Sequence, residues 1–274
     1  MHFSILFHPH KPDSPKLAEE VSRWLVAKNH TSWIGNTFNE SEVHEESQKS
    51  NLMIVLGGDG SILRAARFAV PYDTPILGIN MGRIGFLSET DPQNWPDVLD
   101  KFLSNQYWTE SRLMLRAKHL RNGQETADFI ALNDFVIGGA RARVVRLDLS
   151  VDGDEITTYT ADSLIVATPT GSTAYSMAAG GPLIPPVLNN FLLMPVAPYL
   201  SLDRALVLHQ EAQAHIRVHS DHGAILTVDG QETLELIDND EILITRHNHV
   251  ARFARVGEKG YFYRRLFKRL GFER

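Results

Sequence analysis

The first third of the chain alternates short apolar runs with segments of helical spacing. Short apolar runs that predict strands occupy residues 3–7, 52–56 and 76–79. The continuous apolar run 52–56 is typical of a strand buried on both faces of a sheet. The segments with the pattern of helices are 16–28, 61–69 and 95–103. Strands that alternate with helices predict a parallel sheet covered by helices.

The pattern changes near Ser111 to shorter strands that end in glycine turns. Residues 146–151 alternate polar and apolar side chains before Asp152-Gly153, and residues 225–228 lead into Asp229-Gly230. A further apolar run follows at 242–244. Many short strands with glycine turns predict an all-β domain, and a sandwich is the simplest such architecture.

The composition is that of a globular protein, because 43% of the 274 residues are apolar and 22% are charged. The net charge of −6 argues against nucleic acid as a partner, although a local basic pocket can still hold a small anion. The chain has no cysteine, which excludes disulfides, thiolate catalysis and cysteine metal sites. This composition fits the reducing cytoplasm, where we expect the protein.

Neither end of the chain predicts a membrane protein. The N-terminus lacks the basic start and long apolar core of a signal peptide, and no stretch approaches about 18 apolar residues. The C-terminal segment 261–274 is basic and amphipathic, with Leu266, Phe267 and Leu270 at helical spacing. It is either a helix on a membrane surface or a tail docked on the protein, and its shortness favours the docked tail.

The turn Gly57-Gly58-Asp59-Gly60 is the first candidate for chemistry. It follows a buried strand and opens a helix, so the N–H groups at the helix start would point at a bound phosphate. It is not a Walker A loop, because no Gly-Lys-Ser/Thr follows. The alternative is a tight turn in which Asp59 caps the helix, but three glycines exceed what a cap needs.

A second candidate is the hydroxyl-rich segment Thr168–Ser176, which leads to Ala179-Gly180-Gly181-Pro182. Its hydroxyls can bind a sugar or phosphate, and the ring of Tyr175 can pack against a base. Asp162 precedes this segment and could bind a polar ligand or cap a strand. An ordinary loop rich in Ser and Thr is the alternative interpretation.

The adjacent Asn133 and Asp134 form a third candidate, since their side chains could each bind one hydroxyl of a ribose diol. The alternative is an Asx turn between strands. His219 and His222 lack obvious carboxylate partners, so we predict no metal site there. Ser172 lacks the G-x-S-x-G context of an esterase nucleophile.

In their order and spacing, these segments resemble the NAD kinase family along nearly the whole chain. The glycine turn is only moderately specific, because diacylglycerol kinases, sphingosine kinases and phosphofructokinases share it. The segments Asp162–Gly181, Gly82–Leu87 and Asp229-Gly230-Gln231 are far more specific. The closing stretch Val250–Arg255 is similar to that of the shorter bacterial members.

The resemblance implies a Rossmann-like α/β domain at 1–108, a β-sandwich NAD-binding domain at 109–248, and a segment at 249–274 that returns to the first domain. It implies transfer of the terminal phosphoryl group of ATP, or of polyphosphate, to the 2′-hydroxyl of the adenosine ribose of NAD. The product would be NADP. A divalent ion, usually Mg²⁺, would accompany ATP without a dedicated protein metal site. NAD and ATP would be the small-molecule partners, and the chain would form a homodimer or homotetramer.

The resemblance also implies roles at matching positions. Asp59 would be the general base, Asn133 and Asp134 would hold a ribose diol, and Phe86 would lie near the adenine. From its position alone, one helical turn after Gly60, we expect Arg64 to meet phosphates or else to lie on a solvated helix face. The other expected contacts of the nucleotides are Gly60, Asp162 near the nicotinamide, Thr173, Ala174, Tyr175, Ser176, Ala178, Ala197 and Gln231.

The chain departs from the family pattern at three positions. The usual Asn-Glu pair is Asn133-Asp134 here, so the carboxylate reaches about 1.5 Å less far. Thr160 stands where many relatives carry Arg, and Ala178 stands where some carry Ser. The shorter Asp134 leaves open a catalytically silent NAD-binding sensor, and the shared glycine turn leaves open a lipid or sugar kinase.

Overall fold

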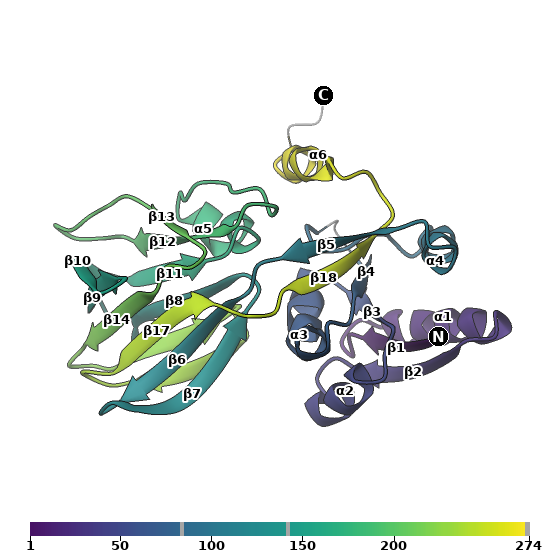
Figure 1. The fold of residues 1–274 in the computed structure, drawn as a ribbon, viewed down its shortest axis with the longest axis horizontal. Coiled ribbons are helices and arrows are strands. Elements are labelled where there is room, and N and C mark those ends of the chain that lie inside the picture. The colour runs from purple at the N-terminus through teal and green to yellow at the C-terminus, as the bar shows by residue number, and fades with distance from the viewer. Residues whose placement is uncertain (83–84, 141–142, 272–274) are drawn as a thin grey trace. The chain divides into compact units, whose positions relative to one another are not determined.

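A computed structural model describes residues 1–82, 85–140 and 143–271 of the chain. The chain forms two compact units, the first made of Met1–Ser111 with His249–Arg274 and the second of Arg112–Asn248. The first unit is α/β and the second is almost entirely β (Figure 1), which confirms the predicted fold class. Among the residues described, no helix is both long and apolar enough to cross a membrane.

The first unit is built on a six-stranded sheet in the order β2-β1-β3-β4-β18-β5. Its strands are β1 (His2–Phe7), β2 (Thr31–Asn36), β3 (Leu52–Gly57), β4 (Ile76–Asn80), β5 (Trp108–Arg112) and β18 (Ala251–Arg255). β1 pairs in parallel with β2 and β3, and β4 pairs in parallel with β3 and β18. The segments that follow β1, β2, β3 and β4 therefore leave the sheet at one edge, where ligands of such sheets bind.

Helices complete the first unit. They are α1 (Ser14–Ala27), α2 (Glu40–Ser47), α3 (Asp59–Ala69), α4 (Trp95–Leu103) and α6 (Tyr261–Arg269), with the 3₁₀ turn η1 (Val70–Tyr72). The three helices predicted near 16–28, 61–69 and 95–103 are confirmed, although α1 and α3 begin two residues earlier than expected. Sequence patterning missed β2 and α2. The apolar signal of α2 is weak, because its buried residues are Val43 and the polar Ser47.

The second unit contains two six-stranded antiparallel sheets. One has the order β10-β9-β14-β17-β6-β7, and the other has the order β13-β12-β11-β8-β15-β16. The strands of the first sheet are β6 (Leu115–Arg121), β7 (Gln124–Ala131), β9 (Val145–Val151), β10 (Asp154–Ala161), β14 (Ala214–His219) and β17 (Glu241–Arg246). Those of the second are β8 (Asp134–Gly139), β11 (Ser163–Ala167), β12 (Asn190–Val196), β13 (Leu206–His209), β15 (Ala224–Val228) and β16 (Glu232–Leu236). The 3₁₀ turn η3 (Gly171–Thr173) and the short helix α5 (Tyr175–Ala178) follow β11.

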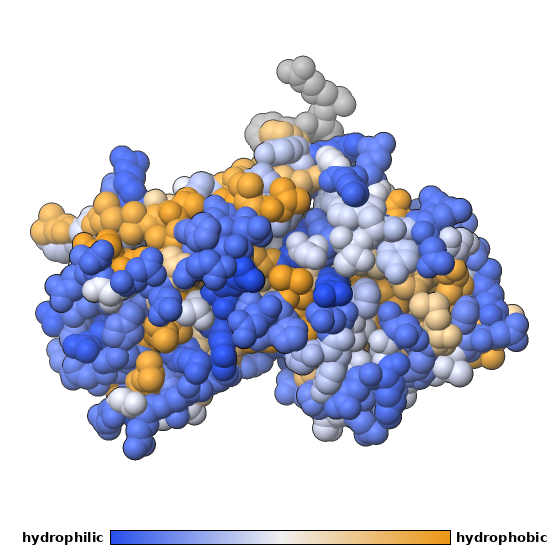
Figure 2. Space-filling model, viewed as in Figure 1, coloured by the Kyte–Doolittle hydropathy of each residue, from blue (hydrophilic) through white to orange (hydrophobic). Residues whose placement is uncertain are grey.

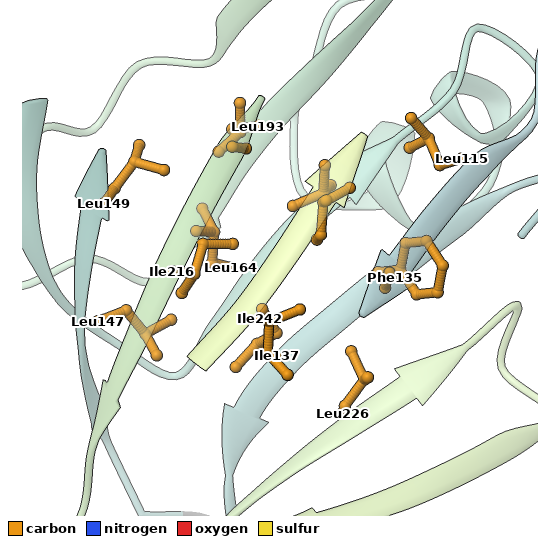
Figure 3. Packing of buried hydrophobic residues seen from close by; sticks show 14 of the residues in the cluster. Leu115, Phe135, Ile137, Leu147, Leu149, Leu164, Leu193, Ile216, Leu226 and Ile242 are labelled. Carbon is orange, nitrogen blue, oxygen red and sulfur yellow. The ribbon is translucent and has the colours of Figure 1, made fainter. Parts of the chain in front are cut away.

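One hydrophobic cluster joins the facing sides of these two sheets (Figure 3). Leu147 and Ile216 come from the first sheet, and Ile137 and Leu164 come from the second, all at 0% exposure. Along β9 and β14, these buried positions alternate with more exposed ones. Two sheets that share one core form a β-sandwich, as the alternating pattern predicted.

Candidate active site

The glycine turn after β3 is also the start of α3. Gly58 is the N-cap with extended backbone, and Asp59 is the first helical residue. Asp59 is therefore not the cap of this helix, which contradicts the purely structural interpretation of the turn. Gly60 is exposed. The turn thus presents a helix start and a carboxylate together at the edge of the sheet where β3 ends.

Two backbone N–H groups hold the Asp59 carboxylate. Phe86 N donates to Oδ2 at 2.9 Å, and Leu87 N donates to Oδ1 at 3.1 Å. A Cβ atom on Gly85 would lie 2.0 Å from Oδ1, so the carboxylate can occupy this place only beside a glycine. Arg83 and Ile84, which belong to the same sequence motif, lie outside the described residues. The motif thus acts through its backbone on Asp59, a role that sequence patterning missed.

Basic groups surround the glycine turn. His8 follows β1, and its Cβ lies 3.8 Å from the place of a Cβ on Gly57. Burial, followed by the charges of His10, Lys11 and Arg64, lowers the pKa of His8. We expected Arg64 here but missed His8 and Lys11. The available signal was their position directly after the first strand of a parallel sheet.

The Arg64 side chain packs against the segment that follows β2. Its guanidinium lies 4.4 Å from the centroid of the Phe38 ring, and Nη1 lies 3.6 Å from Glu40 Oε1. The side chain is 18% exposed. Arg64 is therefore a partly buried cation beside the turn.

In the second unit, Asp229 fixes the turn that carries Asn133 and Asp134. Oδ1 of Asp229 accepts hydrogen bonds from Asn133 N at 2.7 Å and Asp134 N at 3.1 Å. Oδ2 accepts from Leu132 N at 3.1 Å, and Asp229 N donates to Asp134 O at 2.9 Å. Gln231, two residues further along the hairpin, is partly buried. The structure thus brings Gln231's hairpin and the Asn133-Asp134 pair together.

The Asp134 side chain is buried, at 4% exposure. Burial, together with the charge of Asp229, raises the pKa of Asp134 from 3.8 to about 7. Near neutral pH, the neutral carboxyl is therefore well populated, and it can donate as well as accept a hydrogen bond.

The hydroxyl-rich segment after β11 is tied to the same turn. Thr168 N donates to Asn133 O at 2.9 Å, and Thr168 Oγ1 donates to Leu132 O at 2.5 Å. The predicted contact residues of this segment differ in exposure. Thr173 and Ser176 are buried, Ala174 is partly buried, and Tyr175 and Ala178 are exposed. Of the exposed residues in this segment, Tyr175 thus offers a ligand the larger side chain.

Asp162 and Ala197 lie together, away from the other predicted contacts of this unit. Both are exposed, and Asp162 N donates to Val196 O at 3.1 Å. The five residues of β11 separate Asp162 from Thr168. At about 3.3 Å per residue, this distance is about 20 Å.

The structure corrects the expectation that His219 lacks a carboxylate partner. His219 Nε2 lies 2.6 Å from Asp148 Oδ2, because β14 pairs with β9, and Nδ1 lies 3.8 Å from Asp238 Oδ1. These contacts form no metal site. Within the described ranges, no group of three or more His, Cys, Asp or Glu side chains could hold a metal ion.

Comparisons with known proteins match the same family over nearly the whole chain. The ATP-NAD kinase N-terminal domain matches residues 3–107, and the ATP-NAD kinase C-terminal domain matches residues 132–256. The NAD kinase of Chloroflexus aggregans is 36% identical over 97% of both chains. That of Carboxydothermus hydrogenoformans is 42% identical over 81% of this chain and 80% of its own.

Two solved structures are similar to the chain as well. An NAD kinase from Archaeoglobus fulgidus in complex with ATP has a TM-score of 0.79 and 26% identity, with 98% of each chain covered. Yeast NADH kinase complexed with NADH has a TM-score of 0.88, covers 100% of this chain and 88% of its own, and at 24% identity shows the shared fold alone. With both family domains matched and curated relatives covered almost end to end, the chain belongs to the NAD kinase family.

Proposed function

We propose that this chain transfers the terminal phosphoryl group of ATP to the 2′-hydroxyl of the adenosine ribose of NAD, giving NADP. The observation that carries the proposal is the placement of Asp59. Its carboxylate stands at the start of α3 and at the end of β3, and two backbone N–H groups fix its direction. The curated NAD kinases that match the chain supply the substrate class.

In this mechanism, Asp59 accepts the proton of the 2′-hydroxyl while the hydroxyl oxygen attacks the terminal phosphorus of ATP. The bond from that phosphorus to the bridging oxygen breaks, and ADP leaves. A carboxylate has about four lone-pair positions, so the two N–H contacts leave room for the proton. The N–H groups at the start of α3 and the cations Lys11 and Arg64 face the phosphates. The imidazole of His8, whose pKa is lowered, is a neutral hydrogen-bonding group beside them.

The described residues fit a Mg²⁺ ion that the nucleotide brings with it. Mg²⁺ commonly binds through one or two carboxylates together with substrate phosphates. Asp59 is the carboxylate of the turn that would contact such an ion. When bound, the ion would neutralise charge on the phosphates.

The remaining roles follow the resemblance at matching positions. Asn133 and Asp134 hold a ribose diol, and Phe86 lies near the adenine. Tyr175 packs on the dinucleotide, with Gly60, Thr173, Ala174, Ser176, Ala178 and Gln231 shaping its contacts. Asp162 lies near the nicotinamide end, and Ala197 is a further contact of the dinucleotide.

We further propose that the protein acts in the cytoplasm as a homodimer or homotetramer. The second unit exposes large apolar side chains that an association between copies would cover (Figure 2). Leu200 is 91% exposed, Val187 71% and Tyr199 67%. Sedimentation velocity tests this proposal directly, and a monomer at micromolar concentration would contradict it.

A coupled assay that detects NADP formation, with ATP or polyphosphate as donor, tests the proposed reaction. Asp59→Asn should lower kcat by about 100- to 10,000-fold, the usual contribution of a general base. NAD binding, followed by calorimetry, should persist. Asp97→Asn, on the exposed side of α4, is the matched control and should keep full activity. Unchanged turnover by Asp59→Asn would refute the role, and a wild-type chain that forms no NADP would favour the silent sensor.

A further inference from the structure

The last turn of α6 brings a cation to Asp59. Arg269 Nη1 lies 3.5 Å from Asp59 Oδ2, and the guanidinium lies 4.6 Å from the centroid of the Phe86 ring. The two charged side chains are 47% and 26% exposed, so a ligand can reach both. None of the roles assigned above uses Arg269.

Buried contacts anchor α6 in this position. Tyr261 Oη donates to both oxygens of Glu110, at 2.9 and 2.8 Å, and Leu266 is 2% exposed. Arg265 Nη1 donates to Ser88 O at 2.5 Å. Ser88 directly follows the two residues whose N–H groups hold Asp59. α6 is thus fastened to the segment that orients the proposed base.

The proposed reaction brings two negatively charged groups together at Asp59. The product carries a phosphate on the very oxygen that Asp59 activates. Once Asp59 has released the acquired proton to solvent, the bound product places a dianion beside a carboxylate. Like charges this close repel strongly unless a cation lies between or beside them. A guanidinium presents five N–H donors in a planar fork, so Arg269 can contact the carboxylate and a phosphate together.

NAD offers Arg269 no phosphate at the 2′ position. At the 2′ position NAD has a neutral hydroxyl, whereas NADP has a phosphate. A cation held at this position therefore contributes more to binding the product than to binding the substrate. Stacking on Phe86 limits the orientations of the guanidinium plane and keeps its donors directed toward Asp59.

On the basis of the proposed function, we propose that Arg269 is an active-site residue that recognises the 2′-phosphate of NADP. It distinguishes the product from NAD and stabilises the phosphate as it forms beside Asp59. The C-terminal helix is thereby a part of the ligand site.

Calorimetric titration of NAD and NADP, each alone and without ATP, tests the inference. Arg269→Gln should weaken NADP binding about 10- to 100-fold, since hydrogen bonds to charged groups contribute that much. It should change NAD binding less than about 3-fold. Arg269→Lys should restore part of the NADP affinity, because it keeps the charge but lacks the planar fork.

Arg264→Gln is the matched control on the same helix. Arg264 is 71% exposed and pairs with the exposed Glu258 at 2.7 Å, so this variant should bind both nucleotides as the wild type does. An equal loss of NAD and NADP by Arg269→Gln, or no loss of either, would overturn the inference. A wild-type chain that binds neither nucleotide would instead contradict the proposed function itself, and the inference with it.

Discussion

Asp59 depends on Gly85, a residue in a different segment of the first unit. The carboxylate lies where a Cβ of Gly85 would be, at 2.0 Å from Oδ1. Any side chain at position 85 must therefore displace the carboxylate from the N–H groups of Phe86 and Leu87. This contact explains why a glycine directly precedes the two residues that hold Asp59.

Gly85→Ala should consequently lower kcat/KM by about 100-fold, because a misplacement of about 1 Å has effects of that order. The coupled NADP assay measures the loss, and calorimetry should show that NAD still binds. Gly260→Ala is a suitable control, since a Cβ there meets no atom within 4 Å. If Gly85→Ala kept wild-type kcat/KM, the carboxylate would not need its present position.

Candidate site residues were predictable where their immediate neighbours in the sequence point to a site. The glycine turn was found because a buried strand precedes it and a helix follows, and Asn133-Asp134 because the two side chains are adjacent. The N–H groups of Phe86 and Leu87, the room that Gly85 leaves for Asp59, and the carboxylate of Asp229 were not found as partners of these candidates. Their contacts join segments distant in the chain, and periodicity within a short window does not encode such pairings.

At the scale of elements, α6 shows how tertiary contacts decide between two interpretations of one amphipathic pattern. Segment 261–274 was compatible with a membrane surface or with a docked tail. In the structure, Tyr261 and Leu266 are buried within the first unit, while Phe267 is 50% exposed. The buried hydroxyl of Tyr261 meets the carboxylate of Glu110, a partner that lies far away in the sequence.

Tyr261→Phe should loosen α6 while the rest of the first unit stays folded. The variant loses a hydrogen bond to a charged group, which contributes about 1.5–3 kcal/mol. Amide hydrogen exchange in 261–269 should therefore become about 10- to 100-fold faster. Tyr263→Phe removes a hydroxyl from a ring that is 57% exposed and should leave exchange unchanged. Equal exchange rates in the two variants would show that the Glu110 contact does not hold the helix.

At the scale of the whole molecule, the layers were predictable and the strand orders were not. Continuous apolar strands predicted a parallel sheet, and alternating strands predicted a sandwich, because each pattern reports how many faces are buried. The insertion of β18 between β4 and β5 brings the end of the chain into the first sheet. Such long-range pairing depends on the packing of complete units rather than on local sequence.

Asp134 makes the stability of the folded chain depend on pH. Burial and the charge of Asp229 raise its pKa from 3.8 to about 7, so the folded chain retains a proton that the unfolded chain releases. The free energy of unfolding should therefore fall as the pH rises from about 4 to about 7, by up to about 1.4 kcal/mol per pH unit. Above this window the contribution of Asp134 no longer changes.

Asp134→Asn should remove that fall, because the amide has a similar shape and stays neutral at every pH in the window. Urea unfolding of the second unit, followed at pH 5 and pH 8, should then show a smaller loss of stability in the variant than in the wild type. Asp221→Asn, in an exposed turn of the same unit, should retain the wild-type difference. If Asp134→Asn also retained it, the buried carboxyl would not be the group that loses its proton in this window.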